Sequence, residues 1–133
     1  MANRNICHIG LAVRDLEQAI SLYERMFQVM STPPVEREDM RVSMVQFGNI
    51  QVELLEPMTN DGVIAKFLKA RGEGIHHICI EVDDIYEEIE SLKAKGMELV
   101  GGKPRPGIEG KIAFLHPRST CGVLIELCEP EQE

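Results

Sequence analysis

The chain has 133 residues, 44% of them hydrophobic and 27% charged, and its 22 Asp and Glu against 14 Lys and Arg give a formal net charge of −8. This length predicts a single domain, and the composition is that of an ordinary globular protein, which excludes a disordered or fibrous chain. The acidic balance, the absence of Trp and the presence of only four Phe and two Tyr argue against a nucleic-acid partner.

No apolar run approaches the roughly 20 residues that a membrane-spanning helix needs, so we expect no membrane partner. The first residues lead into a strand-like segment without the apolar core of a signal peptide. We therefore expect a cytoplasmic location in a bacterium or archaeon, or the mitochondrial matrix for a processed eukaryotic protein. The cysteines form no C-x-x-C pair, and we expect free thiols in the core rather than disulfides: Cys7, Cys79, Cys121 and Cys128.

The first half of the chain begins with a predicted strand over residues 8–13, in which apolar residues alternate with small or polar ones. Asp15 follows as a predicted N-cap, and apolar residues at three-to-four spacing predict a helix over 16–27. The charged segment 36–39 is interpreted as a mobile loop. Two further strands are predicted after it, over residues 41–47 and 48–56.

The second half begins after a linker over residues 59–74, which contains a predicted short helix at 63–70. A strand is predicted over residues 77–82. Asp83 or Asp84 then caps a second amphipathic helix, for which Gly96 is the expected C-terminal stop. A Pro- and Gly-rich loop and two more strands follow, the strands over residues 110–116 and 122–129.

The two halves repeat each other. The pattern H-I-x-[LI]-x-V occurs at residues 8–13 and again at 77–82. The similar motifs V-E-L-L-E-P and I-E-L-C-E-P end the two halves, at residues 52–57 and 125–130. The fold class predicted from this repeat is α+β, with two tandem β-α-β-β-β modules in one domain covering residues 1–133. The expected bounds are about 5–58 for the first module, 59–74 for the linker and 75–130 for the second module.

Four polar residues lie in equivalent positions of the two modules, on the strand faces that the predicted helices leave uncovered: His8, Glu53, His77 and Glu126. Each alone is explained by ordinary hydrogen bonding or solvent exposure. Together, on strands that are otherwise apolar, two imidazoles and two carboxylates favour a site for a divalent ion such as Co²⁺, Ni²⁺, Mn²⁺ or Zn²⁺. An unpaired carboxylate on such a strand would cost several kcal/mol, about the penalty for burying an uncompensated charge.

Longer stretches carry a family resemblance. Residues 64–68, 74–84, 112–117 and 122–127 resemble the methylmalonyl-CoA epimerases of the vicinal oxygen chelate superfamily, and the similarity extends over nearly the whole chain. The resemblance implies a cupped, mostly antiparallel eight-stranded sheet around a metal site, a homodimer, and one divalent ion per chain, with Co²⁺ first. It places metal ligands at His8, His77 and Glu126, with a fourth at Glu53, where some members have glutamine.

The activity that the resemblance implies is an isomerase reaction, the interconversion of the (R) and (S) epimers of methylmalonyl-CoA. A proton is removed at C2 and returned through an enolate, which needs proton carriers on both faces. Glu126 is the first candidate and Glu53 the other possible carboxylate. The second carrier stays unassigned, because Ser43 stands where some relatives have glutamate, and Glu36 or Glu38 of the charged loop is a weaker alternative.

The remaining histidines and the basic residues are harder to assign. His76 is interpreted as structural because the repeat aligns His77 with His8, and His116 is interpreted as structural because it lies just before Pro117 at a predicted turn. Two basic groups could bind the phosphates of CoA or be ordinary surface charges. The first consists of Lys66, Lys69 and Arg71, and the second of Lys103, Arg105 and Lys111.

Three other functions remain open. A lactoylglutathione lyase of the glyoxalase I type uses the same kinds of ligand, although this chain has F-L-H-P at residues 114–117 where glyoxalases usually resemble F-x-x-D-P-D-G-Y. A metal-free small-molecule-binding protein of the same fold would not need four ligand-type residues in repeated positions. An extradiol dioxygenase would use two histidines and one carboxylate for iron, so a fourth ligand at Glu53 argues against it.

Overall fold

The computed structural model describes residues 4–131 and divides the chain into two compact units. Of these residues, the first unit contains 8–76, and the second contains 77–131 together with 4–7. The class is α+β, as predicted, and the order β-α-β-β-β occurs in each half of the described chain. None of the helices in residues 4–131 is long and apolar enough to cross a membrane.

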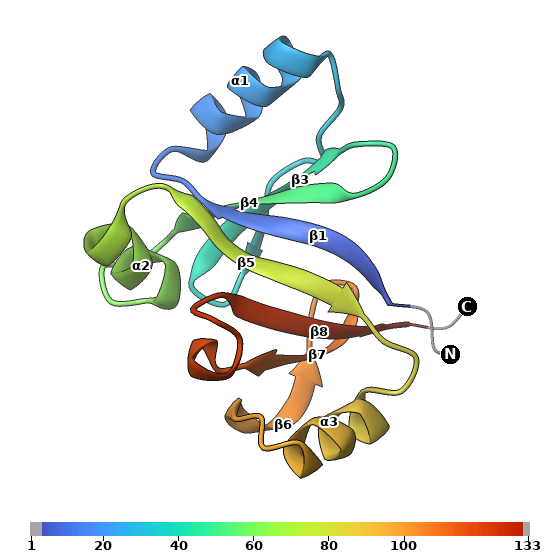
Figure 1. Cartoon of the computed structure of the whole chain (residues 1–133). Helices are drawn as coiled ribbons and strands as arrows, with labels where there is room; N and C mark the ends of the chain where they lie inside the picture. Colours follow the sequence, from blue (N-terminus) through green and yellow to red (C-terminus); the bar gives the residue numbers. More distant parts are fainter. Residues whose placement is uncertain (1–3, 132–133) are drawn as a thin grey trace. The chain divides into compact units, whose positions relative to one another are not determined.

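The first unit is built on four strands in the order β2-β3-β4-β1. β1 and β4 are parallel, whereas β2–β3 and β3–β4 are antiparallel. Figure 1 shows these elements in blue to green. Their bounds are β1 (Asn5–Ala12), α1 (Leu16–Phe27), β2 (Val35–Arg37), β3 (Met40–Gln46), β4 (Gln51–Pro57) and α2 (Val63–Arg71).

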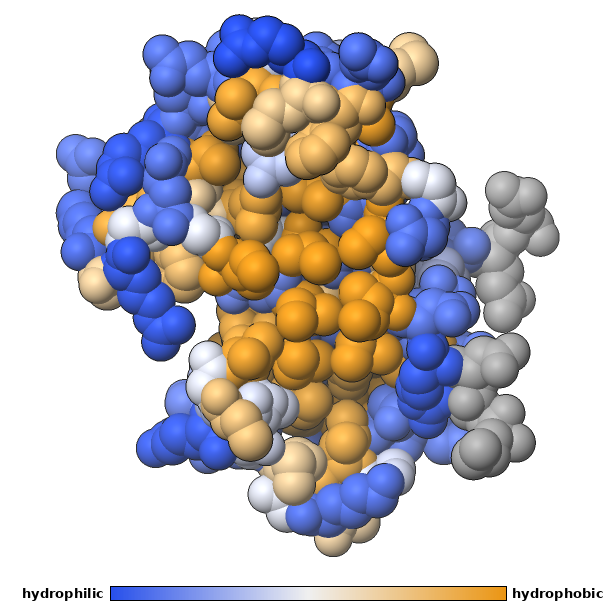
Figure 2. Space-filling model, turned by 45° about the horizontal axis from the view of Figure 1, so that its top comes forward, coloured by the Kyte–Doolittle hydropathy of each residue, from blue (hydrophilic) through white to orange (hydrophobic). Residues whose placement is uncertain are grey.

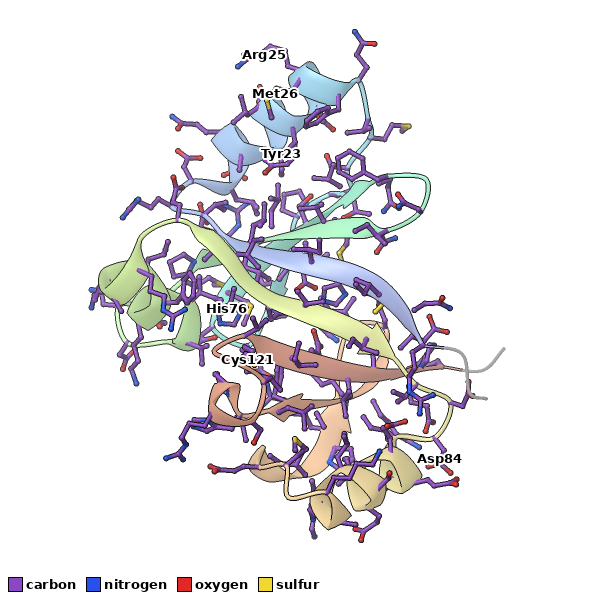
Figure 3. The ribbon with its side chains drawn as sticks, viewed as in Figure 1. Tyr23, Arg25, Met26, His76, Asp84 and Cys121 are labelled. Atoms are coloured by element: carbon purple, nitrogen blue, oxygen red, sulfur yellow. The ribbon has the colours of Figure 1, made fainter. Side chains whose placement is uncertain are left out.

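The second unit repeats this arrangement, with strand order β5-β8-β7-β6. β5 and β8 are parallel, and the other two neighbouring pairs are antiparallel. Its elements are β5 (Gly74–Glu81), α3 (Ile85–Ala94), β6 (Leu99–Pro106), β7 (Gly110–Leu115), a 3₁₀ turn at Pro117–Ser119 and β8 (Leu124–Pro130). Asp84 caps α3 by accepting hydrogen bonds from the backbone of Tyr86 and Glu87, and Figure 3 shows it at the start of this helix.

Two segments predicted as loops are strands. The charged segment that was expected to be mobile contains β2, which pairs with β3 through Val35 opposite Val42, and the turn follows at Glu38. The Pro- and Gly-rich segment contains β6, whose pairing with β7 is interrupted between Val100 and Arg105. Glycine, proline and charged residues have low strand propensity, and pairing with a neighbouring strand overrides it here.

The helices pack on defined faces of the strands. α1 covers one face of the first unit with a core that includes Leu16, Val45 and Leu54. α2 packs through Ile64 and Leu68 against the opposite face of the same strands. In the second unit, α3 covers the strand face that contains the core residues Val82, Ala113 and Leu127.

The E-x-x-E-P motifs within residues 52–57 and 125–130 each contact the start of a helix. In the first unit, Leu16 at the start of α1 donates its backbone N–H to Glu56 Oε2 at 2.7 Å. In the second, Ile85 at the start of α3 donates in the same way to Glu129 Oε1 at 3.0 Å. The second glutamate of each E-x-x-E-P motif therefore binds the N-terminal, positive end of the first helix of its module.

Arg41 binds the Glu56 carboxylate that accepts the Leu16 N–H. Arg41 donates to Glu56 at 3.1 Å and to Glu17 of α1 at 2.6 and 3.0 Å. The hydrogen bonds from Arg41 lower the pKa of the Glu17 carboxyl, and the two carboxylates in turn raise the pKa of Arg41. β4 and α1 are thus joined by a charged bridge as well as by their apolar core.

All four cysteines are free thiols, as predicted. Cys79 and Cys128 are buried and Cys7 is half-buried. Cys121 is exposed, so its expected place in the core is wrong. It lies at a turn with φ of 61°, before β8 begins at Leu124, and is not part of an alternating strand.

Candidate functional site

The first unit contains a buried histidine–carboxylate pair. β1 and β4 lie side by side with Gly10 opposite Glu53, so His8, Gly10 and Glu53 share one strand face. His8 Nε2 lies 3.5 Å from Glu53 Oε1. The exposed fraction is 4% for His8 and 7% for Glu53. Gly10 adds no side chain to that face.

The second unit contains an equivalent pair. Cys79 of β5 lies opposite Glu126 of β8, which places His77 and Glu126 on one face, opposite the side covered by α3. His77 Nε2 lies 3.0 Å from Glu126 Oε1, and both residues are buried, at 4% and 7% exposed. The repeat seen in the sequence is therefore also a repeat of side-chain geometry.

The donor chemistry of each pair fits a divalent ion. A neutral imidazole nitrogen and a carboxylate oxygen are the ligands that borderline metals such as Co²⁺ and Zn²⁺ take from proteins. Each pair presents one of each, and all four side chains are buried. A buried carboxylate needs a compensating positive charge, which either a protonated histidine or a metal ion can provide.

Ser43 does not take the place of the glutamate found in some relatives. It lies opposite Leu54, a residue of the core under α1, so it faces the α1 side rather than the Glu53 side. Its side chain is 0% exposed, and its hydroxyl donates to the Thr32 carbonyl at 2.7 Å. The residues of β3 that face the Glu53 side have no ionisable side chain: Met40, Val42, Met44 and Gln46.

The two other histidines have structural contacts. His76 precedes His77, so strand alternation directs it to the opposite face of β5. Its ring packs edge-on against Phe67 of α2, with 5.1 Å between ring centroids. Figure 3 shows His76 beside α2. His116 Nδ1 accepts the backbone N–H of Arg118 at 3.1 Å and so caps the 3₁₀ turn.

The basic residues that were candidates for binding the phosphates of CoA have different contacts. In α2, Lys69 donates to the Asn60 carbonyl at 2.7 Å, and the Arg71 guanidinium carbon lies 5.8 Å from the centre of the Phe67 ring. Lys111 of β7 pairs with Glu129 at 3.6 Å. The second basic group does not lie on one loop, because Lys103 and Arg105 belong to β6 and Lys111 to β7.

One aromatic residue beside the second pair was not predicted from the sequence. Phe114 of β7 lies opposite Glu126, and its ring meets the His77 ring edge-on at 6.1 Å between centroids. The signal that could have found it is the hairpin between the last two strands, since the register of that hairpin sets Phe114 against Glu126.

Comparisons with known proteins identify the family of the chain. The family model of the glyoxalase/bleomycin resistance protein/dioxygenase superfamily matches residues 7–115. The uncharacterized protein YqjC of Bacillus subtilis is 39% identical over 127 residues, which cover 93% of this chain and 91% of that protein. The mitochondrial methylmalonyl-CoA epimerase of Homo sapiens is 40% identical over 124 residues, 90% of this chain and 70% of that protein.

A solved structure extends the comparison to a complex. A substituted methylmalonyl-CoA epimerase of Streptomyces coelicolor, in complex with 2-nitronate-propionyl-CoA, is 30% identical with a TM-score of 0.90. The match covers 96% of this chain and 98% of that one. The resemblance predicted from the sequence is confirmed at the level of the family.

Proposed function

The chain belongs to the glyoxalase/bleomycin resistance protein/dioxygenase superfamily, and from that membership we propose that it is an isomerase that interconverts the (R) and (S) epimers of methylmalonyl-CoA. The observation that carries the proposal is the 40% identity with the human epimerase over 90% of this chain. The likeness to an epimerase in complex with a propionyl-CoA analogue supports it. The repeated pairs of buried histidine and glutamate supply residue types that this chemistry needs.

The proposal includes one divalent ion per chain, held by His8, Glu53, His77 and Glu126. Each unit contributes one imidazole and one carboxylate, and the two negative charges of the glutamates match the charge of a divalent ion. Co²⁺ is our first choice, and Ni²⁺, Mn²⁺ and Zn²⁺ suit the same donors. When bound, such an ion supplies a Lewis acid for the thioester and carboxylate oxygens of the substrate.

The proton at C2 is the reacting group. Inversion requires that one group remove this proton and another deliver a proton to the opposite face of the planar intermediate. Glu126 is our candidate for one carrier and Glu53 for the other, because the two occupy equivalent positions on β4 and β8. Ser43 is not a carrier in this proposal, since its hydroxyl donates to Thr32 on the α1 side.

The test is an exchange experiment on the metal-loaded protein. Incubation with methylmalonyl-CoA in D₂O should place deuterium at C2, and Glu126→Gln should reduce the rate by about two to four orders of magnitude, the usual contribution of a general acid–base residue. Methylglyoxal with glutathione is the parallel substrate. Turnover of that hemithioacetal without exchange at C2 would replace the epimerase proposal with a lactoylglutathione lyase.

The proposal also includes a homodimer. Large apolar side chains remain exposed in the first unit, among them Met26, Phe27 and Ile75, and Figure 2 shows that apolar side chains reach the surface on the face drawn there. Apolar exposure of this kind is typical of surfaces that are covered in an assembly. Sedimentation equilibrium should give twice the chain mass of 14.9 kDa, and a species of the chain mass at micromolar concentration contradicts this part.

A further inference from the structure

Arg105 lies over Phe114, the aromatic residue beside the second histidine–glutamate pair. It belongs to β6, and its guanidinium carbon lies 5.6 Å from the centre of the Phe114 ring. The Phe114 ring in turn meets His77 edge-on, and Phe114 is the strand partner of Glu126. A fixed positive charge is therefore separated from the His77–Glu126 pair by a single aromatic ring.

The strand register places Arg105 on the same face as the pair. Arg105 lies opposite Ile112, which alternates with Phe114 along β7, and Phe114 lies opposite Glu126. Lys111, one residue before Ile112, faces the other way, where it lies 5.2 Å from the Tyr86 ring of α3. Of the second basic group, Arg105 shares the Glu126 face and Lys111 does not.

Arg105 also differs from the other arginines of its unit. Arg4 pairs with Glu88 at 2.6 Å, and Arg118 pairs with Glu98 at 2.8 Å. Among residues 4–131, Arg105 has no carboxylate partner, although the chain carries 22 acidic residues against 14 basic ones. An arginine side chain without an acidic partner keeps its five N–H donors available for an anion.

The first unit shows that the fold does not require a cation at this position. Val35 of β2 lies opposite Val42 of β3, as Arg105 lies opposite Ile112 of β7. The equivalent strand pair therefore forms with an aliphatic side chain. Because an arginine occupies this position only in the second unit, its role lies in binding a ligand rather than in forming the strand pair.

We propose that Arg105 binds an anionic group of the thioester substrate, with Phe114 holding the guanidinium in place. This inference rests on the proposed function, whose substrate carries two kinds of anion, the malonyl carboxylate and the phosphates of CoA. Both suit the planar donor fork of arginine, which binds carboxylate or phosphate through two parallel hydrogen bonds. Arg105 is thus a determinant of substrate affinity and takes no part in the proton transfer.

The experiment compares steady-state constants of the wild type, Arg105→Gln and Arg105→Lys for methylmalonyl-CoA and for the methylmalonyl thioester of N-acetylcysteamine, which lacks the phosphates. We expect Arg105→Gln to raise KM for the CoA thioester roughly tenfold or more, the loss of a charge-assisted hydrogen bond, with kcat nearly unchanged. Arg105→Lys should recover part of the loss. Arg118→Gln is the matched control and should leave KM unchanged.

The two substrates identify the anion. A higher KM for the CoA thioester alone assigns Arg105 to the phosphates, and a higher KM for both assigns it to the carboxylate. An unchanged KM for both substrates overturns the inference, as does a fall in kcat and melting temperature that lysine does not correct. If the wild type shows no exchange at C2, the proposed function fails by itself, and calorimetric titration of the same variants with free CoA tests whether Arg105 binds the phosphates.

Discussion

His76 and His77 are adjacent, but the structure gives them different neighbours. His77 lies 3.0 Å from the Glu126 carboxylate, whereas His76 packs against Phe67. We expect His77→Ala to abolish bound metal, because it removes one of the four proposed ligands, and His76→Ala to retain it. Metal analysis of the purified proteins after dialysis measures this difference.

The proposed ligand His8 allows the same comparison with a structural histidine. His8→Ala should behave as His77→Ala does, because His8 forms the equivalent pair with Glu53. His116→Ala is the control, since this ring caps a 3₁₀ turn through Arg118. Metal retained in His77→Ala and lost in His76→Ala would show that the strand register assigns the wrong histidine.

The thiols differ in environment by as much as the histidines do. Cys121 is exposed, whereas Cys79 is buried, and hydrogen bonds with Cys128 and Cys7 together with burial raise the pKa of the Cys79 thiol. Because the thiolate is the reactive form, we expect one thiol per chain to react quickly with Ellman's reagent and the buried ones slowly. Cys121→Ser should remove the fast phase, and its persistence in that variant would contradict the assignment.

At the scale of the elements, each module joins its helix to its last strand through a glutamate. Glu56 accepts the backbone N–H of Leu16 at 2.7 Å, and Glu129 accepts that of Ile85 at 3.0 Å. Glu56→Ala leaves this helix-terminal N–H without its partner, and we expect the free energy of unfolding to fall by about 1–2 kcal/mol. Urea denaturation followed by circular dichroism measures the change.

The variant Glu56→Gln distinguishes the hydrogen bond with the Leu16 N–H from the ion pair with Arg41. Glu56→Gln keeps an acceptor oxygen for Leu16 but loses the charge that Arg41 binds at 3.1 Å, so its loss of stability should be the smaller one. Glu129→Ala tests the same contact in the second unit. Equal stability of the wild type and Glu56→Ala would mean that solvent replaces the carboxylate at no cost.

The sequence predicts the elements well where the pattern is periodic. The strands that begin each module and the helices after Asp15 and Asp84 follow from alternation and capping, and both aspartates are N-caps in the structure. β2 and β6 were missed because their signal is not local. β2 is only three residues long, and β6 contains glycines and prolines, so each depends on pairing with its neighbour.

The candidate site shows the same division between pattern and register. His8, Glu53, His77 and Glu126 were found because the repeat and the strand period are visible in the sequence. The direction of Ser43 and the position of Phe114 depend on which residues lie opposite each other in the β3–β4 and β7–β8 hairpins. A shift of one residue in strand register moves every side chain to the other face of the strand, so these details follow only from the folded structure.

On the scale of the whole molecule, the net charge of −8 includes carboxylates that do not belong to the surface. Glu53 and Glu126 are each 7% exposed. If the proposed ion binds both, it removes the electrostatic cost of their burial in the first and the second unit together. Metal binding should then act on the stability of the entire chain rather than on one element.

We therefore expect the metal-loaded protein to melt at a higher temperature than the metal-free protein. A ligand that binds only the folded state, and is present at a concentration about one hundred times its dissociation constant, stabilises that state by about 2.7 kcal/mol. For a chain of this size this corresponds to a rise in melting temperature on the order of 10 °C. Differential scanning calorimetry with Co²⁺, and after treatment with EDTA, measures the shift. Glu126→Gln should lose most of it, and Glu98→Gln, at an exposed carboxylate paired with Arg118, should keep it. The same shift in both variants would place the stabilising ion elsewhere on the chain.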